Sequence, residues 1–89
     1  MSSYLLETYT PAATLFEELE ARVRSAAAEL SESGTPVRYV RSIFVPEDET
    51  CFYLYEAPSA DAVSEAARRS GLTFERINAV AEHREVPGR

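Results

Sequence analysis

Three side chains in this sequence are of types that support acid–base chemistry, and each falls in a segment that alternates like a β-strand. They are Glu7, Arg41 and His83. A carboxylate or imidazole enclosed by aromatic walls loses hydration, which moves its proton affinity toward neutral pH, and a guanidinium can stabilise an anion. We take Glu7 or His83 as the candidate proton acceptor and Arg41 as the anion partner. The alternative is that Glu7 and Arg41 only compensate each other's charge across the sheet or a dimer axis.

Four of the five tyrosines could share a sheet face with these residues, because side chains two apart along a strand point the same way. We predict that their rings and hydroxyls line a ligand-binding or partner-binding face: Tyr9, Tyr39, Tyr53 and Tyr55. The opposite set is mostly apolar and is predicted to bury against helices: Leu6, Val40, Phe44, Phe52, Leu54 and Val80. A partner interface is favoured over a small-molecule site, since interfaces are more common on small open sheets.

The histidine also belongs to the best local set of metal ligands, which is Glu82, His83 and Glu85. His83 and Glu85 would share a strand face, and a dimer would supply two copies of the set. A solvated, charged strand end accounts for the same residues.

Two further features have structural interpretations. Cys51 is the single cysteine, so an intramolecular disulfide is excluded, and no lysine is present to favour its thiolate. We expect a semi-buried structural thiol. The acidic segment 46–50 could attract a hard cation, but it lacks the glycine and alternating oxygen ligands of a calcium loop, so we interpret it as a solvated turn.

Four β-rich segments and two helical segments must position these residues. Strands are predicted over 3–9, 37–45, 51–56 and roughly 76–86. The first helix should begin at a Thr14–Glu17 capping box and end before the Gly34 turn, and the second should run from an N-cap at Ser59 to Gly71. The order predicts an α+β, ferredoxin-like β-α-β-β-α-β fold with both helices on one face of an antiparallel sheet.

An uncovered sheet face of this kind would expose large apolar surfaces, which monomers seldom tolerate. We therefore predict a homodimer that packs face to face as a dimeric α/β barrel. Such an arrangement serves enzymes and binding proteins alike, so the fold does not choose between them.

The composition limits the classes of partner. At 89 residues we expect one domain, residues 1–89, with an ordered core over about 3–86. A net charge of -6 disfavours nucleic acid and anionic membrane surfaces. Without an apolar run long enough to span a bilayer, or a basic-then-apolar leader, we expect a cytoplasmic protein.

Several segments resemble a bacterial family of small ferredoxin-like domains that includes nickel-binding proteins. The resemblance covers about residues 4–86, and its most specific parts are the hairpin Asp48-Glu49-Thr50-Cys51-Phe52 and the segment Tyr55-Glu56-Ala57-Pro58-Ser59. It implies a ferredoxin-like fold, a homodimer and nickel as the possible cofactor. The sequence departs from the family pattern in having no histidine at 64–67.

We therefore expect a homodimer that binds a small ligand or a divalent metal, with nickel implied by the resemblance alone. The alternative is a small dimeric α/β-barrel enzyme of cyclase, isomerase or oxygenase type, acting on an aromatic or polycyclic substrate in a tyrosine-lined cavity. A third class is an interaction module whose tyrosine face only dimerises.

Overall fold

The computed structural model describes residues 1–83. Its elements follow the predicted order: β1 (Ser2–Tyr9), α1 (Phe16–Glu32), β2 (Arg38–Val45), the short 3-10 helix η1 (Pro46–Asp48), β3 (Thr50–Ala57), α2 (Ala60–Ser70) and β4 (Arg76–Val80). This β-α-β-β-α-β order confirms the ferredoxin-like prediction. The dimeric barrel stays a prediction.

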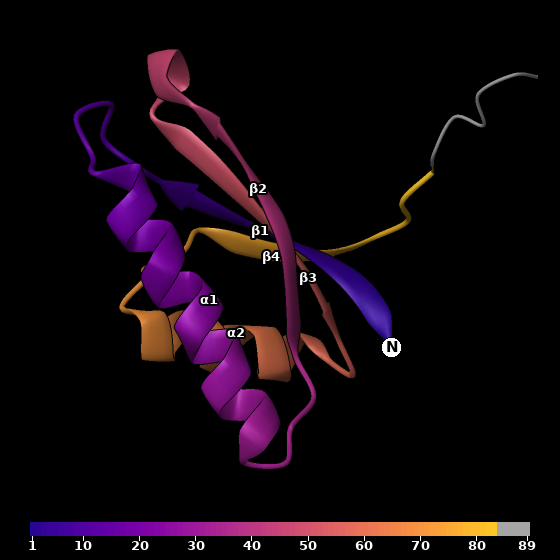
Figure 1. Cartoon of the computed structure of the whole chain (residues 1–89). Helices are drawn as coiled ribbons and strands as arrows, with labels where there is room; N and C mark the ends of the chain where they lie inside the picture. Colours follow the sequence, from indigo (N-terminus) through magenta and orange to yellow (C-terminus); the bar gives the residue numbers. More distant parts are fainter. Residues whose placement is uncertain (84–89) are drawn as a thin grey trace, which may run out of the picture.

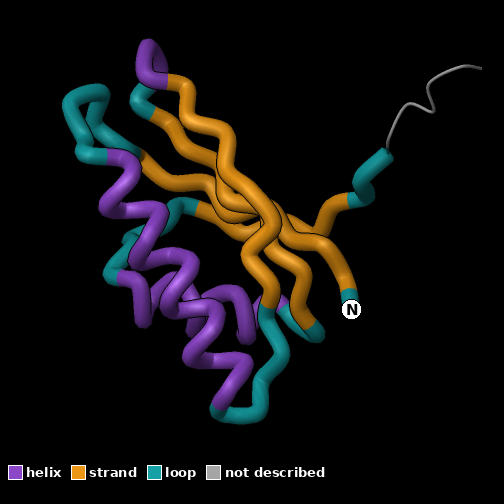
Figure 2. The backbone as a smooth tube through the Cα atoms, in the orientation of Figure 1, coloured by secondary structure: helices purple, strands orange, loops and turns teal. Residues whose placement is uncertain are grey.

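The sheet and the helices form two layers. The four strands are ordered β2-β3-β1-β4, and every neighbouring pair is antiparallel. Both helices lie on the same side of the sheet (Figures 1 and 2). One face of the sheet is therefore covered by helices, and we call it the covered face; we call the other the open face.

The second helix begins and ends where the sequence predicts. The Ser59 hydroxyl accepts a hydrogen bond from the backbone N–H of Ala62 at 3.2 Å, which satisfies an amide that has no partner within the helix. At the other end Gly71 takes a left-handed conformation with φ 83°, which glycine adopts without steric cost.

The first helix begins differently from the prediction. Leu15 occupies the N-cap position of α1, with no side-chain cap, so the Thr14–Glu17 capping box is wrong. Thr14 instead belongs to the preceding turn, where its backbone N–H donates to the Pro11 carbonyl at 2.9 Å. That turn places Thr14 one residue too early to cap the helix.

The core lies between the covered face and the helices. Leu6 from β1, Val23 from α1 and Val63 from α2 are fully buried there. Helix α2 contributes mainly small residues to this layer, Ala62, Ala66 and Ala67. Small side chains on the helix leave room for large side chains on the facing sheet.

The fourth strand is shorter than predicted. It ends at Val80, whereas the sequence predicts a strand to about residue 86. The reason is that, among the described strands, β4 pairs with β1 alone. Val80 pairs with Ser3, close to the Ser2 end of β1, so almost no β1 backbone is left for later residues to pair with. Residues 81–83 continue outside any strand, and the rest of the predicted strand lies outside the described residues.

Neither α1 nor α2, the two α-helices among residues 1–83, combines the length and the apolar character that crossing a bilayer requires.

Candidate functional site

The strand register determines which side chains share the open face. Leu5, Leu54 and Arg41 form one cross-strand row, since Leu54 pairs with both of the others. Phe52 pairs with Glu7 and Ile43 in the next row. Paired residues in a sheet point to the same face, so both rows lie together. The placement of Glu7 and Arg41 on the open face agrees with the prediction.

The predicted placement of three tyrosines is wrong. Tyr53 and Tyr55 are 0% exposed and belong to the core under the helices, together with Cys51. Tyr39 packs against the same core and pairs with Tyr55. Of the four predicted tyrosines, Tyr9 alone has the open-face parity of Leu5 and Glu7, and it is 61% exposed.

A β-bulge explains part of this reversal. The register of β2 against β3 shifts between Tyr39 and Arg41, so that Tyr39 pairs with Tyr55 and Arg41 pairs with Leu54. A bulge inserts an unpaired residue, here Val40, and flips the faces on either side of it. Residues two apart in the sequence therefore point to opposite faces at this place.

Packing volume explains the rest. Both side-chain sets of β3 are largely apolar, and the helix layer accommodates the aromatic set, with small residues on α2 and the Phe16 ring of α1 beside Tyr53. The rings contact one another under the helices: the Tyr39 and Tyr55 centroids are 5.8 Å apart, and those of Phe16 and Tyr53 are 6.4 Å apart. Phe52 and Leu54, which were predicted to pack against the helices, consequently lie on the open face.

The covered tyrosines are held in their neutral form. Burial raises the pKa of Tyr39 to about 12, and its hydroxyl donates to Glu20 Oε2 at 2.7 Å. Burial also raises the pKa values of Tyr53 and Tyr55, whose hydroxyls find no hydrogen-bond partner among residues 1–83. Burial likewise raises the pKa of the Cys51 thiol, which is fully buried rather than semi-buried. These groups are structural in this arrangement, since a raised pKa suppresses both phenolate and thiolate.

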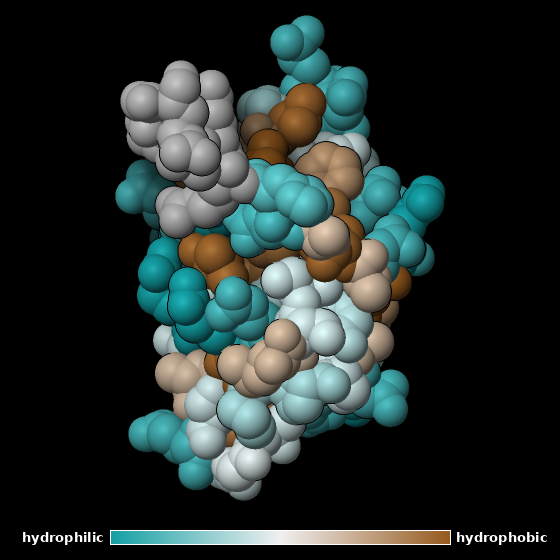
Figure 3. Space-filling model, turned by 90° about the vertical axis from the view of Figure 1, so that its right-hand side faces the viewer, coloured by the Kyte–Doolittle hydropathy of each residue, from teal (hydrophilic) through white to brown (hydrophobic). Residues whose placement is uncertain are grey.

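The open face carries an apolar cleft of about 290 Å³. Its lining consists of aliphatic and aromatic side chains from all four strands, with one ion pair at the edge: Leu5, Arg41, Ile43, Phe52, Leu54, Val80, Ala81 and Glu82. Leu54 is buried within the single chain, whereas Ile43 is 57% exposed. Figure 3 views the molecule from this side and shows hydrophobic residues interspersed among hydrophilic ones.

A second cleft of about 310 Å³ adjoins the first. Its lining is mostly charged and comprises Arg38, Val40, Arg41, Glu56 and Glu82. Arg41 and Glu82 line both clefts and form an ion pair with each other. The apolar and the charged cleft therefore meet at this pair.

Among residues 1–83, each arginine on the open face has a glutamate partner. Besides the pair of Arg41 and Glu82, Arg38 lies 3.5 Å from Glu56 and Arg76 lies 3.2 Å from Glu7. The interpretation that Glu7 and Arg41 compensate each other is wrong within one chain, because each pairs with a different residue. Both charges remain beside the apolar cleft.

The metal-ligand candidates are only partly described. Glu82 is engaged with Arg41, His83 is exposed directly after it, and Glu85 lies outside the described residues. Across residues 1–83, no three side chains of His, Cys, Asp or Glu gather closely enough to hold a metal ion. A closed ligand set would therefore need groups beyond this part of one chain.

Sequence reasoning missed part of the open face. Phe52, Leu54 and Val80 were assigned to the covered face, and the pairing of Arg38 with Glu56 was not anticipated. The turn alone does not indicate this ion pair, because the register that starts from Val45 and Thr50 would bring Arg38 opposite Ala57, and only the bulge between Tyr39 and Arg41 brings it opposite Glu56. The apolar residues left no signal either, since β3 is apolar on both faces.

The fold and this site define a small ferredoxin-like domain with a mixed apolar and charged open face. Residues 4–80 match the family described as nickel-responsive protein SCO4226-like, and the chain belongs to that family. The predicted resemblance to a family of small ferredoxin-like domains is thereby confirmed, and the family description names a response to nickel. A comparison with curated proteins gave no match.

The chain also resembles a solved structure, the crystal structure of SCO4226 from Streptomyces coelicolor A3(2). The TM-score is 0.74 at 20% sequence identity, over 93% of this chain and 100% of that chain. At this identity the likeness shows a shared fold.

Proposed function

We propose that this protein is a homodimer that joins its open faces and binds a divalent metal or a small ligand between them. The observation that carries the proposal is the apolar centre of the open face. Ile43 on β2 is more than half exposed, and Leu5, Phe52 and Val80 on the other three strands are half-buried. Clustered exposed apolar side chains on a small protein mark an interaction surface.

The charges around this centre support an interface. Within the described part of the chain, three Arg–Glu pairs line the open face, at Arg41, Arg38 and Arg76. A protein interface commonly has an apolar core and a polar rim that remains accessible to water. Two such faces packed together would enclose the apolar cleft of each chain.

Nickel is the metal that the family description supports. Glu82 and His83 supply a carboxylate and an imidazole, and imidazole suits nickel. One chain offers too few ligands among residues 1–83, but two copies in a dimer would double the set. His83 is the only histidine of the chain, so any imidazole ligand must come from it.

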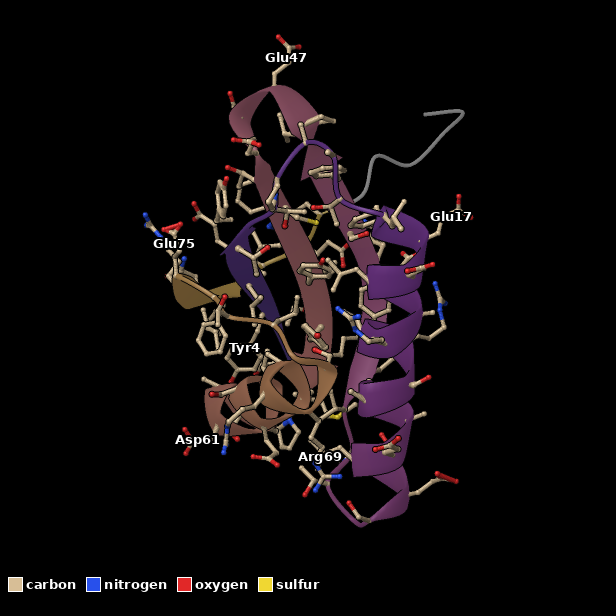
Figure 4. The ribbon with its side chains drawn as sticks, turned by 90° about the vertical axis from the view of Figure 1, so that its left-hand side faces the viewer. Tyr4, Glu17, Glu47, Asp61, Arg69 and Glu75 are labelled. Atoms are coloured by element: carbon tan, nitrogen blue, oxygen red, sulfur yellow. The ribbon has the colours of Figure 1, made fainter. Side chains whose placement is uncertain are left out.

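Native mass spectrometry with and without added nickel tests the proposal, because it reports subunit number and bound metal together. We expect a dimer that takes up stoichiometric nickel at pH 7. His83→Ala should abolish uptake while the dimer persists. Glu47→Ala is the matched control, since Glu47 projects from the turn between β2 and β3 (Figure 4). A monomer would contradict the proposed homodimer, and a dimer that takes up no nickel would contradict the proposed nickel binding.

The alternative enzyme keeps Glu7, Arg41 and His83 as its catalytic candidates. The apolar cleft beside Arg41 favours it, because a substrate could lie against the apolar wall with its anionic part on the guanidinium. The tyrosine-lined cavity of this alternative is not supported, since Tyr39, Tyr53 and Tyr55 lie on the covered face. Loss of turnover in Glu7→Gln with an intact dimer would favour the enzyme.

A further inference from the structure

We propose that the two clefts that meet at Arg41 and Glu82 form one site for an apolar α-amino acid. The amino-acid side chain would occupy the apolar cleft, and its ammonium and carboxylate groups would face the charged cleft. This inference deepens the proposed function, since it names a ligand class for the same open face. The clefts themselves belong to a single chain and can be tested in a monomer as well as in a dimer.

The apolar cleft fits an aliphatic or aromatic side chain. Leu54 is almost inaccessible, while Leu5 and Phe52 flank it on the open face. Ile43 and Val80, from opposite edge strands, also line the cleft. Removing apolar ligand surface from water at such a site provides affinity but does not orient the ligand. The polar groups must therefore determine which end of the ligand enters the apolar cleft.

The charges in the neighbouring cleft fit a zwitterion. Arg38 and Arg41 contribute two positive charges, and Glu56 and Glu82 contribute two negative ones, so their formal charges cancel. A lone anion or a lone cation would leave this balanced set with an excess charge. A zwitterion preserves the balance, with its carboxylate on an arginine and its ammonium on a glutamate.

The spacing of the charges favours an α-amino acid over a longer zwitterion. Arg41 and Glu82 are in direct contact, and an α-amino acid carries both charges on substituents of one carbon. The ligand dipole can therefore lie alongside the ion pair. The side chains of Arg41 and Glu82 are 55% and 31% exposed, and exposed ion pairs contribute little stability, so the pair can rearrange around a ligand.

Isothermal titration calorimetry of the purified protein, with a chelator present, tests the ligand class. The probes are L-leucine, 4-methylpentanoate, which lacks the ammonium group, and 3-methylbutylamine, which lacks the carboxylate. We expect L-leucine to bind, and each truncated probe to bind about ten-fold more weakly or worse, because it leaves charged groups of the site unpaired. Glycine tests the apolar cleft and should also bind more weakly. Equal binding of L-leucine and 4-methylpentanoate would overturn the proposal, as would no binding of L-leucine at millimolar concentration.

Two variants separate the roles of the shared ion pair. Arg41→Gln should weaken L-leucine and 4-methylpentanoate alike, whereas Glu82→Gln should remove the preference for L-leucine over 4-methylpentanoate. Arg68→Gln is the matched control, because Arg68 forms an exposed ion pair with Glu65 on α2, within the opposite layer. Circular dichroism confirms that each variant is folded. An unchanged preference in folded Glu82→Gln would overturn the assignment.

The subunit number of the same sample keeps the two proposals apart. A dimer that does not bind L-leucine contradicts this inference and leaves the homodimer standing. A monomer that binds L-leucine contradicts the homodimer and supports the site in the single chain.

Discussion

The two faces of this sheet use aromatic and charged residues in opposite ways. The covered face buries tyrosine rings under helices and holds their hydroxyls away from water. The open face leaves Ile43 exposed and surrounds its apolar centre with Arg–Glu pairs. The comparison teaches that tyrosine content alone does not identify a binding face, because a phenol ring can serve as core where the helix layer leaves room for it.

The largest expected difference between the faces concerns stability. Tyr53→Ala should lower the free energy of unfolding by about 3 to 5 kcal/mol, because it leaves a cavity in a close-packed layer. Ile43→Ala, on the open face, should change it by about 0.5 kcal/mol or less in protein diluted until it is monomeric. Urea denaturation measures both. Comparable losses at the two positions would remove the distinction between the faces.

Alkaline pH should lower the stability of the fold through the tyrosines of the covered face. The pKa values of Tyr39, Tyr53 and Tyr55 are raised above the ordinary value of 10.0. Between the unfolded and folded pKa values, the unfolded chain has lost protons that the folded chain retains, so stability falls as pH rises. The stabilisation that the protonated tyrosines provide is complete below about pH 10. It is lost as the pH rises further, and for Tyr39 the loss extends to about pH 12.

Each tyrosine that stays protonated in the fold contributes a slope of up to about 1.4 kcal/mol per pH unit. Urea denaturation from pH 8 upward, about one pH unit at a time, measures the slope. The double variant Tyr53→Phe with Tyr55→Phe should flatten it. An unchanged slope in that folded variant would show that these two hydroxyls are not the groups responsible.

A smaller effect is expected on assembly through the open face. Ile43→Asp places a charge at the apolar centre and should raise the dimer dissociation constant at least about ten-fold, equivalent to about 1.4 kcal/mol. Analytical ultracentrifugation over a dilution series measures the change. Leu15→Asp is the control, because Leu15 is 70% exposed but lies at the start of α1. Equal effects of the two variants would argue against an open-face dimer.

The smallest effect should come from the ion pair at Glu7. Glu7→Gln removes its interaction with Arg76, and a pair this exposed contributes less than about 1 kcal/mol to folding. Thermal unfolding should therefore stay close to that of the parent protein. A large loss would show that Glu7 supports the fold as well as lining the open face.

Much of the fold could be predicted because its signals are local. The strand ends near Tyr9 and Ala57, the Ser59 cap and the Gly71 terminus all follow from side-chain period and turn chemistry. The prediction of a Thr14 cap is wrong because this residue belongs to a separate turn made with Pro11. The predicted end of β4 is wrong because the end of this strand depends on where β1 begins, many residues away.

The candidate site could be predicted only in part. The prediction placed Glu7 and Arg41 on the open face, and the structure agrees, although the bulge separates Arg41 from Tyr39, which alternation assigns to the same face. Their partners, Arg76 and Glu82, follow from the neighbouring strand and the segment after it, which alternation within one strand does not determine. The ligand roles of Tyr9, His83 and Glu82 remain predictions.

By itself, the sequence determined the order of strands and helices and the two side-chain sets of each regular strand, because these depend on a period of two and on turn residues. Only the tertiary structure decided which set of β3 the helices cover. The bulge at Val40 reverses the faces within β2, and the small residues of α2 admit the tyrosine set. Both effects depend on residues brought together by folding, so no pattern within a single strand contains them.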